Sequence, residues 1–125
     1  MDIRNTTRGT LPRIPFERLA QSALGSRYEL SLVICGDALA RGMNREHRGK
    51  IYAPNVLSFP LSRTEGEIFI NIRAAEREAK KYAVSVSERL ALLYVHGLFH
   101  LAGMRHSASM DSKERTLLKK FGFAR

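Results

Sequence analysis

The sequence predicts an α+β fold, a small mixed sheet flanked by about five helices. Several segments repeat apolar residues at helical spacing, short runs show the apolar or alternating pattern of strands, and glycines and prolines separate the segments. A length of 125 residues corresponds to a single domain, which we expect to span residues 1–125. With 44% hydrophobic and 26% charged residues, the composition excludes a disordered chain.

The first half of the chain predicts two helices and one strand. Residues 1–15 contain a glycine and two prolines, so no regular element is expected there. Apolar residues at helical spacing predict a helix over 16–24, and the run ELSLVIC predicts a mostly buried strand over 29–35. Asp37 is expected to cap a short helix that ends near residue 45, and a loop is expected over 46–55.

A β-hairpin is predicted next. Its strands are expected over 56–61 and 67–72, with a turn at Glu65 and Gly66 between them. In the second strand isoleucines alternate with other residues, which indicates one buried face. Pro60 has no N–H group to donate to a neighbouring strand, so we expect the first strand at an edge of the sheet or near its own end.

Two helices with clear N-terminal signals follow the hairpin. Asn71 is expected to cap a helix over 73–83 that turns its alanines and Tyr82 inward. The segment S-V-S-E at residues 85–88 is a capping box and begins a strongly apolar helix. That helix is expected to end at Gly103, because glycine is the residue preferred in the left-handed conformation after a helix.

A last helix is predicted near the C-terminus, over residues 112–121. Asp111 is expected to be its N-cap, with Glu114 at the third helical position, and Gly122 is expected to end it.

The charge of the chain predicts a polyanionic partner. It carries 21 Lys and Arg against 12 Asp and Glu, for a net charge of +9 that is spread along the sequence. A compact domain this positive attracts RNA or DNA, and charge kept for solubility is the alternative explanation. The single cysteine, Cys35, is typical of a reducing compartment, and the N-terminus lacks a signal-peptide pattern. No apolar run approaches the ~18 residues that span a bilayer. These features predict a cytoplasmic protein without a membrane partner.

Three of the four histidines lie within eleven residues, and their spacing predicts a metal site. His96 and His100 are four residues apart on a helix, so their rings project from one face. Gly103 lets the chain reverse, and His106 can then supply a third nitrogen. Three neutral imidazoles leave one position of a divalent ion open, which is the arrangement of catalytic zinc sites. Zinc is the expected metal, although nickel, copper and cobalt also accept imidazole ligands.

The pattern H-x-x-x-H-x-x-G-x-x-H also has the spacing of the metzincin protease motif. In that motif a glutamate follows the first histidine and acts as the general base, but here the position is Gly97. A metalloprotease would therefore need a base from elsewhere. A single histidine in an apolar helix is usually a satisfied core residue, whereas three unpaired imidazoles in apolar surroundings would be costly.

The segment 96–106 resembles H-G-x-L-H-L-x-G-Y-D-H, the signature of the YbeY-type endoribonucleases, which are rRNA maturation factors. Residues 48–50 and 55–60 are similar to the family's R-G-K-x-x-P-T-D-V-L-S-F-P, and residues 66–70 are similar to its G-D-I-x-I strand. These blocks cover about residues 44–106 in the family's order.

The resemblance implies a metal-dependent, single-strand-specific endoribonuclease that acts in 16S rRNA 3′-end maturation and ribosome quality control. It implies His96, His100 and His106 as metal ligands and Arg48 as the residue that holds a substrate phosphate, with Arg48 and His100 as catalytic residues. Water activated by the metal would attack the RNA phosphodiester, since the motif itself contains no carboxylate base. The implied partners are the 16S rRNA precursor and the ribosome, and no DNA is expected.

Two departures from the family pattern affect these expectations. Arg105 stands before the third histidine where the family has aspartate, and it cannot orient an imidazole as a carboxylate does. Asn55 replaces the aspartate before V-L-S-F-P and can support the cleft only through its amide. A non-catalytic RNA- or ribosome-binding factor with a structural metal therefore stays an alternative, with a metalloprotease as a third.

Aromatic residues near these motifs have two interpretations. Tyr52, Phe59 and Phe69 can be surfaces on which RNA bases stack, but the strand positions of the two phenylalanines favour a place in the core.

Overall fold

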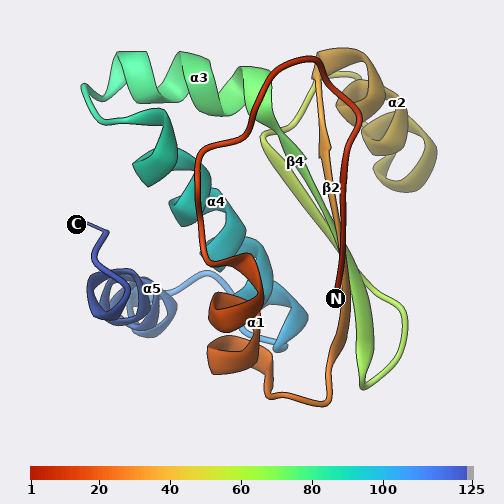
Figure 1. The fold of residues 1–125 in the computed structure, drawn as a ribbon. Helices are drawn as coiled ribbons and strands as arrows, with labels where there is room; N and C mark the ends of the chain where they lie inside the picture. The colour runs from red at the N-terminus through yellow and green to blue at the C-terminus, as the bar shows by residue number, and fades with distance from the viewer. Residues whose placement is uncertain (124–125) are drawn as a thin grey trace.

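A computed structural model describes residues 1–123 and shows a four-stranded mixed sheet with helices on both faces (Figure 1). In the order β1-β2-β4-β3, strand β2 (Glu29–Cys35) pairs in parallel with both β1 (Asp2–Asn5) and β4 (Glu65–Asn71). Strand β3 (Val56–Pro60) pairs with β4 antiparallel. The predicted α+β class with a mixed sheet is confirmed.

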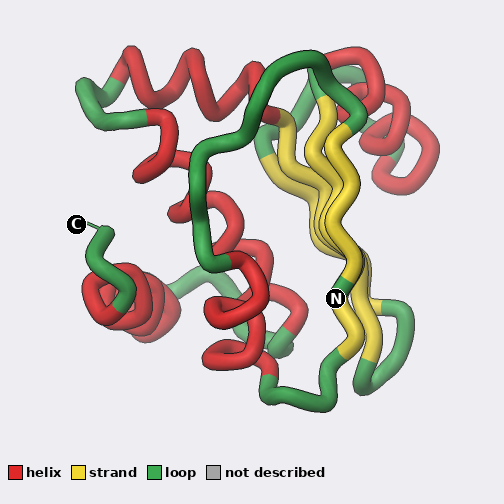
Figure 2. The backbone as a smooth tube through the Cα atoms, viewed as in Figure 1, coloured by secondary structure: helices red, strands yellow, loops and turns green. Residues whose placement is uncertain are grey.

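The helices form one thick and one thin layer around the sheet (Figures 1 and 2). Four of them lie on one side: α1 (Phe16–Leu24), α3 (Ile72–Lys81), α4 (Val86–Leu101) and α5 (Ala108–Lys120). The fifth, α2 (Asp37–Arg48), covers the opposite face. None of the helices within residues 1–123 is both long and apolar enough to cross a lipid bilayer.

Helix α4 is the centre of the main core because it is apolar on nearly all sides. Leu90 and Leu98 are fully buried between the sheet and the other helices. The hydroxyl of Tyr94 donates a hydrogen bond of 2.7 Å to the carbonyl oxygen of Phe16, which joins α4 to α1. A smaller apolar cluster lies between the sheet and α2, formed by Val33, Cys35, Ala40, Leu57 and Phe69. The main core thus holds α4 rigidly against the sheet.

Most of the predicted strands are present, with differences at their ends. The hairpin is confirmed, and Pro60 lies on edge strand β3 as expected. The turn predicted at Glu65 and Gly66 is wrong, because the backbone N–H groups of Leu61 and Ser62 both donate to the carbonyl oxygen of Glu65 and place the turn before it. Strand β1 lies in the segment expected to be irregular. It is short, polar and exposed, so only its pairing with β2 defines it.

The predicted caps of two helices are wrong. Asp37 is the first residue of α2 and follows the N-cap Gly36, and its carboxylate bonds instead to Asn71 and Arg77. This helix runs three residues beyond the predicted end, to Arg48, where Gly49 adopts φ +67° and ends it.

Helix α5 begins earlier than predicted, because Ser107 and not Asp111 is its N-cap. The Ser107 hydroxyl accepts a hydrogen bond from the backbone N–H of Met110. Glu114 therefore lies in the second turn of the helix, free of any capping role. The Asn71 cap of α3 is confirmed, since its side chain accepts from two backbone N–H groups of that helix. Tyr82 was expected to face inward but is 51% exposed.

Candidate metal centre and cleft

The three histidines of the motif converge at the C-terminal end of α4. The capping box begins the helix as predicted, with the Ser85 hydroxyl accepting from the Glu88 N–H at 3.0 Å. The four-residue spacing then brings the Nε2 atoms of His96 and His100 to 3.0 Å from each other. Nitrogen ligand atoms from these two residues and His106 all lie within 4.8 Å of one another.

A turn at Gly103 delivers the third histidine. Gly103 has φ +88°, and its N–H donates to the carbonyl oxygen of His100 at 2.9 Å. The N–H of Met104 donates to the carbonyl oxygen of Phe99 at 3.0 Å, which completes the two-bond Schellman ending of a helix. The imidazoles of His96 and His106 then lie with ring centroids 5.1 Å apart. The predicted reversal of the chain at Gly103 is confirmed.

The donor set fits one divalent ion. Nitrogens bound at the usual zinc–nitrogen distance of about 2.0–2.1 Å lie about 3.3 Å apart in a tetrahedral site. The observed separations, 3.0 Å between two Nε2 atoms and at most 4.8 Å among the three residues, reach this value with small side-chain rotations. His96 is half-buried while His100 and His106 are exposed, so the cluster is open to solvent on one side.

Glu114 is a residue of the site that the histidine motif does not reveal. From α5, its Oε2 lies 2.6 Å from Nδ1 of His96, and the Glu114 residue is only 6% exposed. In the tautomer whose Nδ1–H donates to this carboxylate, Nε2 of His96 carries no proton and faces Nε2 of His100. A carboxylate behind a ligating histidine is the usual support of a metal site. The only signal for this role is that an acidic residue occupies a buried position of the amphipathic helix α5.

The electrostatics around His100 favour its neutral imidazole. Partial burial, followed by the neighbouring imidazole of His96, lowers the pKa of His100, and a backbone hydrogen bond at Met104 opposes part of that shift. Because a metal binds only the neutral imidazole, a lowered pKa keeps this ligand available at neutral pH.

The histidines open into a cavity of about 600 Å³ that also contains Arg48 and Glu114. Arg48, the last residue of α2, donates from Nη2 to the carbonyl oxygen of Ser58 at 2.9 Å. Its guanidinium carbon lies 5.2 Å from the ring centroid of Phe59, which is half-buried rather than in the core, whereas Phe69 is buried. The fold therefore brings together all four residues that were predicted for the site.

Gly97 faces the sheet and not the histidine cavity. A Cβ atom there would lie 3.0 Å from Oγ of Ser58 and 3.2 Å from Cδ1 of Ile68. The Ser58 hydroxyl donates to the Gly97 carbonyl oxygen at 3.2 Å, so α4 and β3 approach closely at this point. A side chain at position 97 would therefore be crowded by β3 and β4, which disfavours a glutamate at the position where the metzincin motif has its general base.

Comparison with known proteins identifies the family. The family model described as Endoribonuclease YbeY matches residues 4–122. The chain belongs to the endoribonuclease YbeY family. The endoribonuclease YbeY of Pelotomaculum thermopropionicum is 35% identical over 116 residues, which cover 84% of this chain and 76% of the relative. That of Helicobacter pylori strain Shi470 is 33% identical over 128 residues, with 97% and 91% covered.

The YbeY-type resemblance that the histidine motif indicated is thus confirmed. A solved structure shows that the fold is shared as well. The solution structure of TM1509 from Thermotoga maritima matches with a TM-score of 0.69 at 20% identity, over 96% of this chain and 87% of that one.

The two departures of this YbeY-family chain from the signature have different structural settings. Arg105 is exposed, and the carboxylate that supports His96 comes from Glu114 on another helix. Asn55 lines the histidine cavity, where its Nδ2 donates to Oε2 of Glu78 at 3.0 Å. Glu78 also accepts from Nε of Arg89 at 2.7 Å. The Asn55 amide thus supports the cleft by donating a hydrogen bond to the Glu78 carboxylate, which an aspartate at position 55 would repel.

Proposed function

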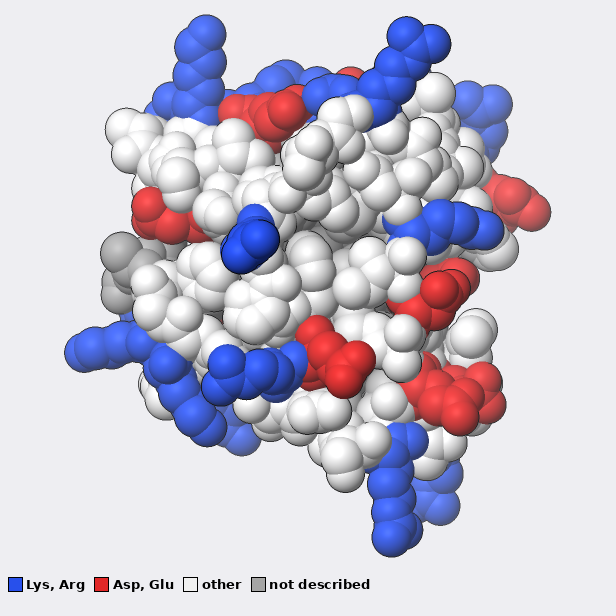
Figure 3. Space-filling view, in the orientation of Figure 1, with Lys and Arg blue, Asp and Glu red and all other residues white. Residues whose placement is uncertain are grey.

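We propose that this YbeY-family protein is a metal-dependent, single-strand-specific endoribonuclease acting in 16S rRNA 3′-end maturation and ribosome quality control. The observation that carries the proposal is the single cavity that holds a three-histidine cluster, a buried carboxylate and Arg48. The endoribonuclease name of the relatives and the net charge of +9 support RNA as the substrate. Lys and Arg side chains are scattered over the face of the molecule that Figure 3 shows. Its partners would be the 16S rRNA precursor and the ribosome, and one domain over residues 1–125 would work in the cytoplasm.

We assign His96, His100 and His106 as the ligands of one divalent ion, with zinc as the expected metal. When bound, such an ion supplies Lewis-acid polarisation of a phosphoryl oxygen and of an attacking water. Glu114 holds the proton on Nδ1 of His96 and so directs Nε2 toward the ion. The open side of the cluster, at the two exposed histidines, is where the phosphodiester would enter.

Arg48 would bind the scissile phosphate. Its guanidinium is held on one side by the Ser58 carbonyl oxygen and lies against the ring of Phe59. The planar group presents five N–H donors, so the bond to Ser58 leaves others for phosphate oxygens. Negative charge on the non-bridging oxygens grows during phosphodiester cleavage, and a positioned arginine stabilises that charge in the transition state.

Cleavage assays test the proposal. Zinc-loaded protein and a His100→Ala variant are incubated with single-stranded RNA, duplex RNA and casein, while elemental analysis measures bound metal. We expect the unmodified protein to cut single-stranded RNA only, and the variant to lose both metal and cleavage while it keeps its far-UV circular dichroism. His47→Ala, which changes the one histidine outside the motif, should keep its metal.

The other outcomes identify the alternatives. Cleavage of casein would replace the proposal with a metalloprotease. Salt-sensitive RNA binding without cleavage by the zinc-loaded protein would favour a non-catalytic RNA-binding factor.

A further inference from the structure

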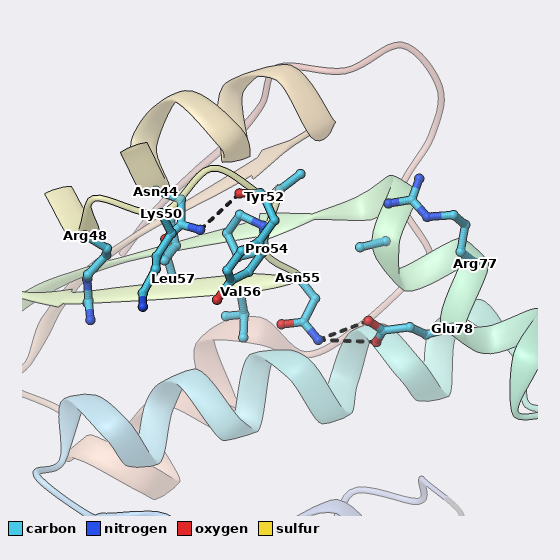
Figure 4. Close-up of a pocket in the computed structure, with 12 residues that line it drawn as sticks. Asn44, Arg48, Lys50, Tyr52, Pro54, Asn55, Val56, Leu57, Arg77 and Glu78 are labelled. Atoms are coloured by element: carbon cyan, nitrogen blue, oxygen red, sulfur yellow. Dashed lines mark hydrogen bonds between the residues drawn. The ribbon is translucent and has the colours of Figure 1, made fainter. Parts of the chain in front are cut away.

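A second cavity of about 500 Å³ adjoins the histidine cavity and has no role in the function proposed above. It lies between β3, α3 and the loop 49–55 that connects α2 to β3 (Figure 4). The two cavities share Arg48, Asn55, Val56 and Leu57, so they are neighbours along β3 on one continuous groove. A single-stranded substrate held at the histidines would therefore extend into this second cavity.

The loop that walls the second cavity is held by one buried amide. Asn44 on α2 is 2% exposed, and its Nδ2 donates to the carbonyl oxygen of Tyr52 at 3.0 Å. The backbone carbonyl oxygen of Asn44 accepts from the N–H of Lys50 at 3.3 Å, after the left-handed turn at Gly49. Because both hydrogen bonds come from a rigid helix, the loop is preorganised instead of folding around its ligand.

The loop presents one aromatic ring and one cation, Lys50, beside Arg48 at the end of α2. Tyr52 is 60% exposed at the wall of the cavity. Within residues 1–123 no aromatic ring or cation packs on it, whereas Tyr82 is covered by the cations of Lys81 and Arg89. Figure 4 shows the side chains of Arg48 and Lys50 extending in the same direction across β3 toward α4. The loop thus offers an unused stacking surface beside a pair of positive charges.

The charged residues are distributed unevenly along the second cavity. Arg48 and Lys50 lie at one end, and Glu78 lies at the other, bonded to Asn55 (Figure 4). Arg77 also lines the second end but pairs with Asp37, and Glu78 there pairs with Arg89. A phosphate is therefore attracted to the first end, where Arg48 and Lys50 make no ion pair within residues 1–123. The wall between the two ends includes the apolar side chains of Val56 and Leu57.

We propose that the second cavity is a nucleotide subsite for single-stranded RNA, in which Tyr52 stacks on an unpaired base while Lys50 and Arg48 contact the adjoining phosphates. The inference rests on the proposed function, because it extends the same groove from the scissile phosphate by a neighbouring nucleotide. Stacking on an exposed ring beside cations is the general mode of single-strand binding, and a volume near 500 Å³ accommodates a nucleotide. Duplex RNA keeps its bases stacked inside the helix, so this subsite favours single strands.

The protein contains no tryptophan, so Tyr52→Trp places a single fluorophore at the subsite. The probe is an unpaired octamer of adenosine with a fluorescent label at one end, and binding to the metal-free chain is followed by the anisotropy of the label and by tryptophan emission. We expect the emission of Tyr52→Trp to be quenched as the octamer binds. Tyr52→Ala should weaken octamer binding by at least about fivefold, the lower end of the effect of a stacked base.

Salt dependence separates stacking from charge. Lys50→Ala should make the slope of log K against log salt shallower by about 0.7, the value of one single-strand phosphate contact. Tyr52→Ala should weaken binding but leave this slope unchanged. The matched controls are Tyr82→Ala and Tyr82→Trp, which alter an exposed tyrosine outside both cavities and should change neither affinity nor emission on binding.

Every other result contradicts either the nucleotide subsite or the nuclease proposal. If the octamer binds but Tyr52→Trp emission does not change, or Tyr52→Ala binds as tightly as the unmodified chain, the subsite is overturned even where RNA cleavage persists. Absence of octamer binding to the unmodified chain also overturns it, and a protein ligand would then be sought. Quenching together with a zinc-loaded protein that never cleaves RNA would retain the subsite and reject the nuclease.

Discussion

The contact between Glu114 and His96 leads to the most specific prediction about the metal centre. We expect Glu114→Gln to weaken zinc binding while the fold stays intact. Glutamine keeps the shape of the side chain but removes the negative charge that polarises the Nδ1–H group 2.6 Å away. Loss of such a partner typically costs 10–100-fold in metal affinity, which corresponds to about 1.4–2.8 kcal/mol.

Glu114→Ala should have a larger effect, because the residue is buried and its removal leaves the Nδ1–H of His96 without an acceptor. An unsatisfied buried donor costs about 1–3 kcal/mol of stability in addition to the lost metal affinity. The free energy of unfolding of the metal-free protein, measured in urea, should therefore fall clearly in the alanine variant and little in the glutamine variant.

Competition with a chromophoric chelator measures the zinc affinity of each variant. Asp111→Asn is the matched control, since it removes an exposed carboxylate from the same helix and should leave zinc affinity unchanged. If Glu114→Gln binds zinc as tightly as the unmodified protein, the carboxylate does not orient His96 and its burial has another cause.

Three further predictions concern the scaffold of the site. Gly97→Ala should lower the free energy of unfolding in urea by about 1 kcal/mol, because crowding of its Cβ against Ser58 and Ile68 exceeds the ~1 kcal/mol that alanine gains over glycine inside a helix; an unchanged or higher midpoint would contradict the close approach. Asn55→Asp should lower the free energy of unfolding at pH 7, because two carboxylates would replace the 3.0 Å hydrogen bond, and a urea midpoint equal to that of the unmodified protein would contradict this contact. Hydrogen bonds, of which the one from Arg77 has the largest effect, lower the pKa of Asp37 from 3.8 to about 2. The ionised Asp37 therefore stabilises the folded protein fully above pH 3.8, and this stabilisation is lost as the pH falls toward 2. Asp37→Asn should therefore show a smaller decrease in stability between pH 5 and pH 2 than the unmodified protein, and an identical decrease would refute the assignment.

The parts of this protein that the sequence predicted correctly depend on interactions over a few residues. The pairing of His96 with His100 follows from 3.6 residues per turn, and the reversal at Gly103 follows from the left-handed conformation that glycine permits. The caps at Asn71 and Ser85 are likewise local hydrogen bonds. Stereochemistry of the chain determines such features before any tertiary contact forms.

The predictions that are wrong concern helix N-caps for which two neighbouring residues compete, and a strand that has no apolar pattern of its own. Asp37 and Asp111 are both good N-cap residues, but Gly36 and Ser107 precede them and occupy the caps in the folded chain. Strand β1 carries no apolar alternation, so only its partner β2 makes it a strand.

The sequence by itself determined the metal-binding pattern, the helix that carries it and the reversal that follows it. Only the tertiary structure decided what surrounds the metal-binding pattern. Glu114 reaches His96 because α5 packs on α4, and Arg48 reaches the same cavity from the opposite layer of the sheet. Gly97 faces β3 for the same reason. The contact of Glu114 with His96 joins residues 18 positions apart, and that of Gly97 with Ser58 joins residues 39 positions apart. Their geometry depends on how the cores pack, which local periodicity does not specify.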